Sequence, residues 1–315
     1  MNKKIKPLFI IGYPRSGTTL LLYILRSTGE YPIYDFDETH FFSHFYFRYG
    51  KLNKAAQQDR FLSDLTSSTW FKSSGLSKKE FFSSLSKEVL SYQSVLSTFM
   101  ELIAVKQGKE RWLEKTPWHL LYINEIARFF PEAKFIFLTR DPRSVVQSVT
   151  TAGWISTKRG GGLRVAASWR WHNLHACREL QKYKNRYITL KYEDIILNTT
   201  SIFRKLSEFL CINFDIDSIK YDPKINTLAK SNSSYNEDIT GLSDIPLLRW
   251  KKDMELGSIK TIEAVVGSDC MKKFGYDPYL AEKISFPYRM MHRYINRFYS
   301  LSKIARLKLF PLVRR

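Results

Sequence analysis

Residues 7–22 read Pro7-Leu-Phe-Ile-Ile-Gly12-Tyr-Pro-Arg15-Ser16-Gly17-Thr18-Thr19-Leu-Leu-Leu22. The apolar run Leu8–Ile11 predicts a buried strand, and the residues from Thr18 onward predict a helix. A tight loop between a strand and a helix directs several backbone N–H groups, together with the helix N-terminus, at one point in space. We therefore predict that this loop binds an anion such as phosphate or sulfate.

The loop departs from the P-loop of nucleoside-triphosphate enzymes at one position. That motif reads G-x-x-x-x-G-K-[ST], whereas this chain reads Gly12-x-x-x-x-Gly17-Thr18-Thr19. The lysine that reaches a γ-phosphate is absent, and Arg15 stands earlier in the loop. The sequence therefore disfavours an ordinary ATPase or GTPase, although it keeps the anion-binding loop.

The composition describes a basic protein with enough apolar residues for a large core. The chain has 315 residues, of which 44% are hydrophobic, so one large α/β domain is possible. The net charge of +20 favours anionic partners. Because residues 283–315 contain nine Lys or Arg and no Asp or Glu, we divide the chain into a domain over 1–282 and a basic extension over 283–315.

Cysteine usage and the N-terminus predict a cytoplasmic protein. The three cysteines are widely spaced and form neither a disulfide framework nor a metal-ligand pattern. The N-terminus leaves no room for a signal peptide, and no apolar run approaches the ~20 residues of a spanning helix. Apolar residues recur on one helical face of the tail, so residues 288–315 are predicted to contact an anionic membrane surface. A helix docked on the domain is the alternative.

Strand candidates alternate with helical segments, which predicts a parallel sheet and an α/β fold. Residues 51–106 are interpreted as a helical insertion, in which the capping box Ser77-Lys-Lys-Glu80 opens a helix through the Phe81–Val105 region. Thr116-Pro117 and Asp141-Pro142 predict helix starts at the carboxyl edge of the sheet, where α/β proteins bind ligands. The strand candidates after the first are Tyr31–Tyr34, Arg111–Leu113, Lys134–Thr139 and Tyr187–Lys191.

Arg140 and Ser148 form a candidate phosphate site. A hydrophobic strand delivers Arg140 to the sheet edge, and the following helix places Ser148 two turns further on, able to face back. A guanidinium group suits a phosphate, and the serine adds a hydroxyl. The alternative for Arg140 is a surface ion pair with Asp141 or Glu132. Arg143 is expected to be an exposed helix residue.

Two further segments place charged groups at strand ends. Residues 35–42 carry Glu38 and His40 two positions apart, on one side of the chain if it is extended. Residues 112–117 place Lys115 at the end of another strand candidate. The alternatives are a solvated turn for Glu38, a half-buried structural histidine for His40, and a solvated pair with Glu114 for Lys115.

In this order, the segments resemble the sulfotransferase superfamily, whose donor is 3′-phosphoadenosine-5′-phosphosulfate (PAPS). The resemblance covers the opening loop, the Glu-x-His, Glu-Lys-Thr-Pro and Arg-x8-Ser segments, and Leu248-Arg-Trp-Lys…Lys273-Phe-Gly-Tyr276, and so spans about residues 7–278. It implies a P-loop NTPase-like three-layer fold with a central parallel sheet flanked by helices.

The resemblance also implies roles for individual residues. Glu38 matches the general base of the glycan and tyrosyl-protein branches, and Lys115 matches a lysine near the transferred group. Cytosolic members carry a lysine where Arg15 stands, so the chain looks closer to Golgi-type and bacterial carbohydrate enzymes. The implied donor site holds the 5′-phosphosulfate on Arg15, Ser16, Gly17, Thr18 and Thr19 and the 3′-phosphate on Arg140 and Ser148.

These expectations combine into an in-line sulfuryl transfer from PAPS to a hydroxyl of a carbohydrate or glycolipid. Arg15 and Lys115 would stabilise charge on the leaving phosphate without a metal, and Glu38 would take the hydroxyl proton. His40 is the alternative base, or the residue that orients Glu38. No nucleic-acid partner is expected. The rival hypotheses are an ATP-dependent small-molecule or nucleotide kinase and a non-catalytic protein that binds anions or nucleic acid.

Overall fold

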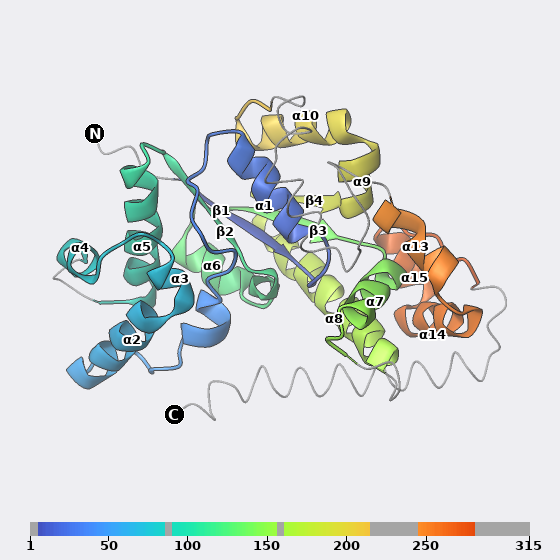
Figure 1. Ribbon diagram of the computed structural model, residues 1–315, viewed down its shortest axis with the longest axis horizontal. Helices are drawn as coiled ribbons and strands as arrows, with labels where there is room; N and C mark the ends of the chain where they lie inside the picture. The colour runs from blue at the N-terminus through green and yellow to red at the C-terminus, as the bar shows by residue number, and fades with distance from the viewer. Residues whose placement is uncertain (1–5, 86–89, 156–160, 215–244, 281–315) are drawn as a thin grey trace.

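The structure is a computed structural model that describes residues 6–85, 90–155, 161–214 and 245–280 (Figure 1). The basic tail over 283–315 lies outside the described residues, so its contact with a membrane stays a prediction. None of the described helices combines the length and the apolar character that crossing a membrane requires.

The central sheet has four parallel strands in the order β2-β1-β3-β4. Its register pairs Ile10 of the first strand with Lys115 on one side and with Ile136 on the other. Since β2 and β3 lie on opposite sides of β1, the strand order reverses at β1, and α/β sheets bind ligands at such a point. The strands are β1 (Lys6–Gly12), β2 (Arg111–Lys115), β3 (Lys134–Thr139) and β4 (Tyr187–Lys191), which confirms four of the five predicted strands.

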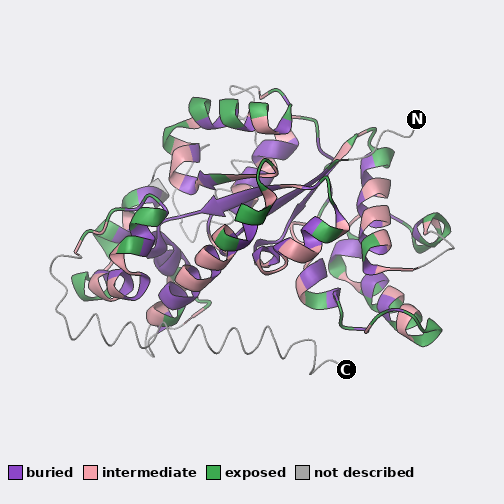
Figure 2. Ribbon diagram, turned by 180° about the vertical axis from the view of Figure 1, so that it is seen from behind, coloured by how far each residue is buried: buried purple, intermediate pink, exposed green. Residues whose placement is uncertain are grey.

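Apolar side chains on the strands alternate between the two faces of the sheet. Leu8 and Ile10 belong to one apolar cluster, whereas Phe9 and Ile11 belong to another. This period of two is expected for strands buried on both faces, and Figure 2 shows the strands buried while the outer helix faces are exposed. The first face is covered by α1 (Thr18–Ser27) and α10 (Thr199–Leu210), and the second by α5 (Tyr92–Lys106), α6 (Ile123–Phe129) and α8 (Gly161–Leu180), as Figure 1 shows.

The helical insertion over residues 51–106 lies beside β2, which is an edge strand of the sheet (Figure 1). The prediction of one helix through Phe81–Val105 is wrong, although the Ser77 capping box is present. The first helix ends at Ser84, and Ser91 caps the next one through a second capping box with Ser94. A second start signal therefore divides the segment. Its helices are α2 (Ala55–Ser67), α3 (Thr69–Lys72), α4 (Lys78–Ser84) and α5.

Tyr31–Tyr34 is not a strand, which corrects the fifth strand prediction. Both backbone groups of Ile33 bind the side-chain amide of Gln107, with N···O distances of 2.8 Å and 2.6 Å. Pro32 lacks the N–H that a ladder requires. The Gln107 amide thus binds the backbone groups of Ile33 that a neighbouring strand would bind, and the segment does not join the sheet.

The remaining helices follow the last two strands. Helix α7 begins directly after β3, and α9 begins directly after β4, so both start at the carboxyl edge of the sheet. A group of three helices packs beside α7 and α8 (Figure 1). The bounds are α7 (Pro142–Thr151), α9 (Tyr192–Leu197), α13 (Ile245–Asp253), α14 (Leu256–Val266) and α15 (Ser268–Lys273), with short turns η1 (Phe41–Phe45), η2 (Pro117–Leu121) and η4 (Gln181–Tyr183).

Candidate active site

The loop between β1 and α1 has the backbone of an anion-binding loop. Arg15 and Gly17 have φ values of 69° and 88°, and the Ser16 N–H donates to the carbonyl of Tyr13 at 3.1 Å. The N–H groups in the first turn of α1 have no intrahelical acceptors, and they lie at the positive end of the helix dipole. The buried Oγ of Ser16 has no hydrogen-bond partner among the described residues. A ligand oxygen would satisfy that hydroxyl, so the loop fits an anionic group.

Tyr192, the first residue of α9, packs its ring against Gly17. A Cβ atom on Gly17 would lie 2.3 Å from Cδ2 of Tyr192. The same ring lies under the guanidinium of Arg140, whose Cζ is 4.4 Å from the ring centroid. The ring of Tyr192 therefore supports two parts of the predicted donor site.

We expect Gly17→Ala to destabilise the protein by about 2–5 kcal/mol, because an L-residue in this left-handed conformation costs about 1–2 kcal/mol and overpacking about 1–3 kcal/mol. Gly29→Ala is the matched control, since Gly29 also has a positive φ but a Cβ there would meet nothing within 4 Å. Urea unfolding of both variants measures the difference. Equal losses would show that the contact with Tyr192 does not constrain Gly17.

Three residues of the predicted donor site converge: Arg140 and Ser148, predicted for the 3′-phosphate, and Arg15, predicted for the 5′-phosphosulfate. Arg140 follows the end of β3, and its Nη1 donates to the backbone carbonyl of Arg15 at 3.1 Å. The Nε of Arg15 donates to Oγ of Ser148, on α7, at 2.9 Å. Arg15 also stacks on Trp154, with Cζ 5.2 Å from the ring centroid, a contact that no sequence signal indicated. The side chain of Arg15 is therefore directed toward Ser148.

Arg143 corrects another expectation, because it is only 4% exposed. Asp141 caps α7 and binds the guanidinium through both carboxylate oxygens, while Glu263 of α14 accepts from Nη1 at 2.7 Å. Burial by itself lowers the pKa of Arg143, but Asp141 and Glu263 outweigh it and raise the pKa. Trp250 of α13 covers the cation, with the ring centroid 3.9 Å from Cζ. Arg143 thus fixes the helix that carries Ser148.

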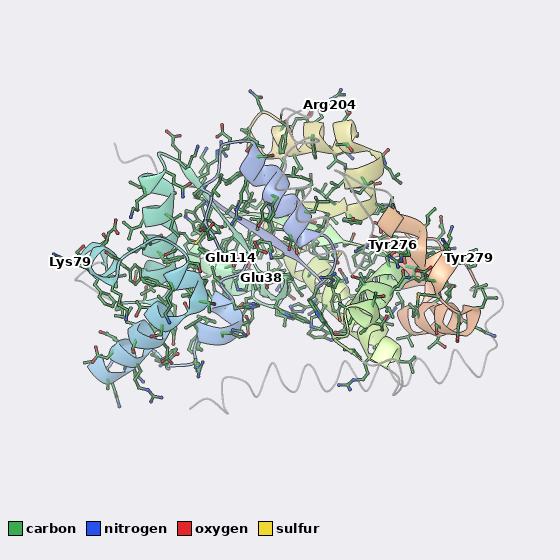
Figure 3. All side chains as sticks on the ribbon, viewed as in Figure 1. Glu38, Lys79, Glu114, Arg204, Tyr276 and Tyr279 are labelled. Atoms are coloured by element: carbon green, nitrogen blue, oxygen red, sulfur yellow. The ribbon has the colours of Figure 1, made fainter. Side chains whose placement is uncertain are left out.

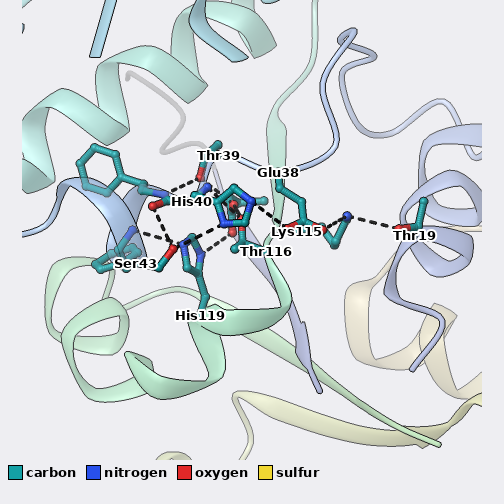
Figure 4. Close-up of polar contacts among 11 residues, drawn as sticks. Thr19, Glu38, Thr39, His40, Ser43, Lys115, Thr116 and His119 are labelled. Carbon is teal, nitrogen blue, oxygen red and sulfur yellow. Dashed lines mark hydrogen bonds and ion pairs between the residues drawn. The ribbon is translucent and has the colours of Figure 1, made fainter. Parts of the chain in front are cut away.

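Lys115 connects the loop with the candidate base (Figure 4). Its buried Nζ donates to Oε1 of Glu38 at 2.8 Å and to Oγ1 of Thr19 at 3.3 Å. The Lys115 side chain is 1% exposed and that of Glu38 is 28% exposed. The alternative of a solvated pair between Lys115 and Glu114 is therefore wrong. A buried cation here lies between an anion-binding loop and a carboxylate that solvent can reach.

His40 contacts the second oxygen of Glu38, with Nε2 3.2 Å from Oε2. Burial lowers the pKa of His40, and the neighbouring His44 lowers it further, while Glu38 raises it in part. The net pKa is below the ordinary value, so the ring is neutral at pH 7 and contacts the carboxylate of Glu38 without a charge of its own. His40 was expected to be the base, the residue that orients Glu38, or a half-buried structural histidine. The contact with Oε2 fits the orienting role.

Four polar residues beside these groups were missed as site residues. Thr116 was expected to cap a helix, but its Oγ1 donates to Oε1 of Glu114 at 2.6 Å, and η2 begins without a side-chain cap. Thr39 and His119 also donate to Glu114. One sequence signal was available: Glu114 and Lys115 are consecutive on a strand, so their side chains must point to opposite faces. Figure 3 shows Glu38 and Glu114 close together, far from Tyr276 and Tyr279.

The arrangement suits transfer of an anionic group to a hydroxyl. Preorganised cations and N–H groups stabilise charge that develops on a leaving oxygen, and a carboxylate at the same place accepts a proton. Within the described ranges, no group of three or more His, Cys, Asp or Glu side chains lies close enough to hold a metal ion.

Comparison with known proteins agrees with this geometry. The family model described as "Sulfotransferase family" matches residues 7–215. A protein-tyrosine sulfotransferase of Drosophila melanogaster is 23% identical over 292 residues, covering 88% of this chain and 53% of that protein. Protein-tyrosine sulfotransferase 1 of Danio rerio is 24% identical over 291 residues, covering 88% of this chain and 74% of its own length. The chain therefore spans about half the length of the fly protein.

Two solved structures share the fold. The sulfotransferase domain from the curacin biosynthetic pathway superposes with a TM-score of 0.54 at 19% identity, covering 86% of this chain and 97% of that domain. The sulfotransferase domain from the Synechococcus PCC 7002 olefin synthase gives a TM-score of 0.51 at 18% identity, covering 83% and 94%. These matches confirm the predicted P-loop-like α/β fold.

Proposed function

Because this chain belongs to the sulfotransferase family, we propose that it transfers the sulfuryl group of PAPS to the phenolic hydroxyl of a tyrosine in a protein or peptide. The observation that carries the proposal is the buried Lys115, which bridges Thr19 of the anion-binding loop and the carboxylate of Glu38. The names of the two relatives support a tyrosine acceptor over the carbohydrate or glycolipid expected from the sequence.

The 5′ and 3′ ends of PAPS would bind at two different places around the loop between β1 and α1. The N–H groups at the start of α1 and the Ser16 hydroxyl suit the 5′-phosphosulfate. Arg140 and Ser148 suit the 3′-phosphate, because both contact Arg15 and so lie near each other. The backbone carbonyl of Arg15 accepts from Arg140, and its Nε donates to Ser148. This placement gives the missing P-loop lysine a simple meaning, since the donor has no γ-phosphate to hold.

Glu38, Lys115 and His40 then each have a task in the reaction. The phenolic oxygen attacks sulfur, the bond between sulfur and the bridging oxygen breaks, and its electron pair stays on the phosphate of adenosine 3′,5′-bisphosphate. Glu38 accepts the phenolic proton, and the charge of Lys115 stabilises the leaving oxygen. A free phenol has a pKa of about 10, so its proton is easier to remove than that of an aliphatic alcohol. His40 holds the free oxygen of Glu38 in place.

The test is transfer of radioactive sulfur from PAPS to matched peptides that contain tyrosine or phenylalanine. We expect label on the tyrosine peptide alone, together with calorimetric binding of adenosine 3′,5′-bisphosphate. Labelling of glycans without labelling of the peptide would overturn the acceptor. Binding of ATP with no binding of the bisphosphate would favour a kinase. Binding without turnover, with an affinity that follows salt alone, would favour a non-catalytic protein.

A further inference from the structure

Glu114 is a buried carboxylate to which the transfer reaction assigns no task. It precedes Lys115 on β2, and consecutive side chains of a strand point to opposite faces of the sheet. Its Oε1 accepts from Oγ1 of Thr39 at 2.8 Å and from Oγ1 of Thr116 at 2.6 Å. Its Oε2 lies 2.7 Å from Nδ1 of His119. Both oxygens are therefore occupied, although the side chain is inaccessible to water.

The hydrogen bonds around His119 define its protonation state. The backbone N–H of Phe42 donates to Nε2 at 3.2 Å, so this nitrogen carries a lone pair. The ring proton is therefore on Nδ1, and it donates to an ionised Glu114. Burial by itself raises the pKa of Glu114, but His119, Thr116 and Thr39 outweigh it and lower the pKa. Thr39, Thr116 and His119 thus all bind the carboxylate of Glu114.

This network fastens the segment that carries the candidate base. Thr39 follows Glu38 directly, and the next N–H, from His40, donates to Oγ1 of Thr116 at 3.2 Å. Together with the bond from Phe42 to His119, these contacts dock residues 39–42 onto residues 114–119. Since Glu38 directly precedes residues 39–42 and Lys115 lies within residues 114–119, the docking of the two segments sets where Glu38 and Lys115 meet.

We propose that Glu114 and His119 are a positioning pair that holds Glu38 in register with Lys115. This role rests on the proposed function, because it assigns the pair to the placement of a base. Neither residue is a catalytic residue, since each acts through the segment that it anchors. A misplacement of about 1 Å in such a group can lower a rate by about 100-fold.

The test is Glu114→Gln, which keeps the volume but introduces a donor. The Gln amide can accept from Thr39 and Thr116, but its NH₂ group then faces the Nδ1–H of His119. Moving that proton to Nε2 would set it against the N–H of Phe42, so one bond fails in either tautomer. We expect kcat to fall by about 10–100-fold, with unchanged KM for PAPS and unchanged affinity for the bisphosphate.

Glu179→Gln is the matched control, because Glu179 is also a buried carboxylate that accepts from three side chains. It lies near the end of α8 and none of these contacts involves the site, so its kcat should equal that of the wild type. An equal loss in both variants would overturn the proposal in favour of general destabilisation. Thr39→Val, which removes one bond to Glu114, replaces Glu114→Gln if that variant does not fold, and we expect its kcat to fall by up to about 10-fold.

Nitrogen NMR of the histidine rings separates this inference from the proposed function. We expect Nδ1 of His119 to carry a proton and Nε2 to accept from Phe42, and the His40 signal to shift in Glu114→Gln because its contact with Glu38 moves. An unchanged His40 signal, a proton on Nε2 of His119, or full kcat in folded Glu114→Gln would overturn the positioning role. A wild type that binds the bisphosphate but transfers no sulfur would instead overturn the proposed function, and the NMR signals would still decide the position of Glu38.

Discussion

Glu38→Gln is expected to lower kcat by about 10²–10⁴-fold, the range for removal of a general base. The variant keeps the shape of the side chain, and its amide oxygen can still accept from Nζ of Lys115. What it loses is the ability to take the phenolic proton. The affinity for adenosine 3′,5′-bisphosphate should not change, because no donor-site residue is altered. Initial rates at saturating PAPS and peptide, together with calorimetry, provide the measurement.

His40→Gln is the control that separates the two candidate bases. Glutamine can still donate to Oε2 of Glu38, so an orienting histidine should be replaced with a loss of about 10-fold or less, in keeping with the modest net value of one hydrogen bond. A base at His40 would instead be lost entirely. If His40→Gln abolished turnover while Glu38→Gln retained it, the assignment of the base would be reversed.

The sheet was predictable because its signals are local. Leu8–Ile11 and Lys134–Thr139 are apolar runs of strand length, and a strand buried on both faces requires little else. Asp141 caps α7 as predicted, because a cap acts within one turn. Tyr31–Tyr34 had the same local pattern, but its backbone partner is the side chain of Gln107, 74 positions away. No local pattern reports such a partner.

Arg15, Lys115 and Arg140 could be placed at the carboxyl ends of parallel strands from the sequence, whereas Glu38 follows Tyr31–Tyr34, which is not a strand. The contacts among the site residues were not predictable, because they join segments that are remote in sequence. Lys115 and Glu38 are 77 positions apart, and Arg15 and Ser148 are 133 positions apart. Arg143 was misjudged for the same reason, since α13 and α14 lie more than 90 residues further along the chain and cover it. Charge patterns within one segment do not reveal a buried pair whose partner comes from another.

Lys115→Met is expected to lower kcat by about 10²–10³-fold, as removal of one preorganised donor at a developing oxyanion does. Methionine fills the buried space of the lysine stem but supplies no charge to the leaving oxygen. The KM for the peptide should change little, because the acceptor gains no contact from Nζ in the ground state. Single-turnover rates with labelled PAPS measure the chemical step directly. A normal single-turnover rate would remove Lys115 from the chemistry.

The double variant of Lys115→Met and Glu38→Gln decides whether the two residues act as a unit. Nζ of Lys115 is bound to the carboxylate that takes the proton, so loss of the lysine also disturbs the base. Effects of residues that act together are strongly non-additive. The double variant should therefore retain more activity than the product of the two single losses allows. Losses that multiply would mean that leaving-group stabilisation and proton removal are independent, and that the ion pair between Lys115 and Glu38 serves only to place each group.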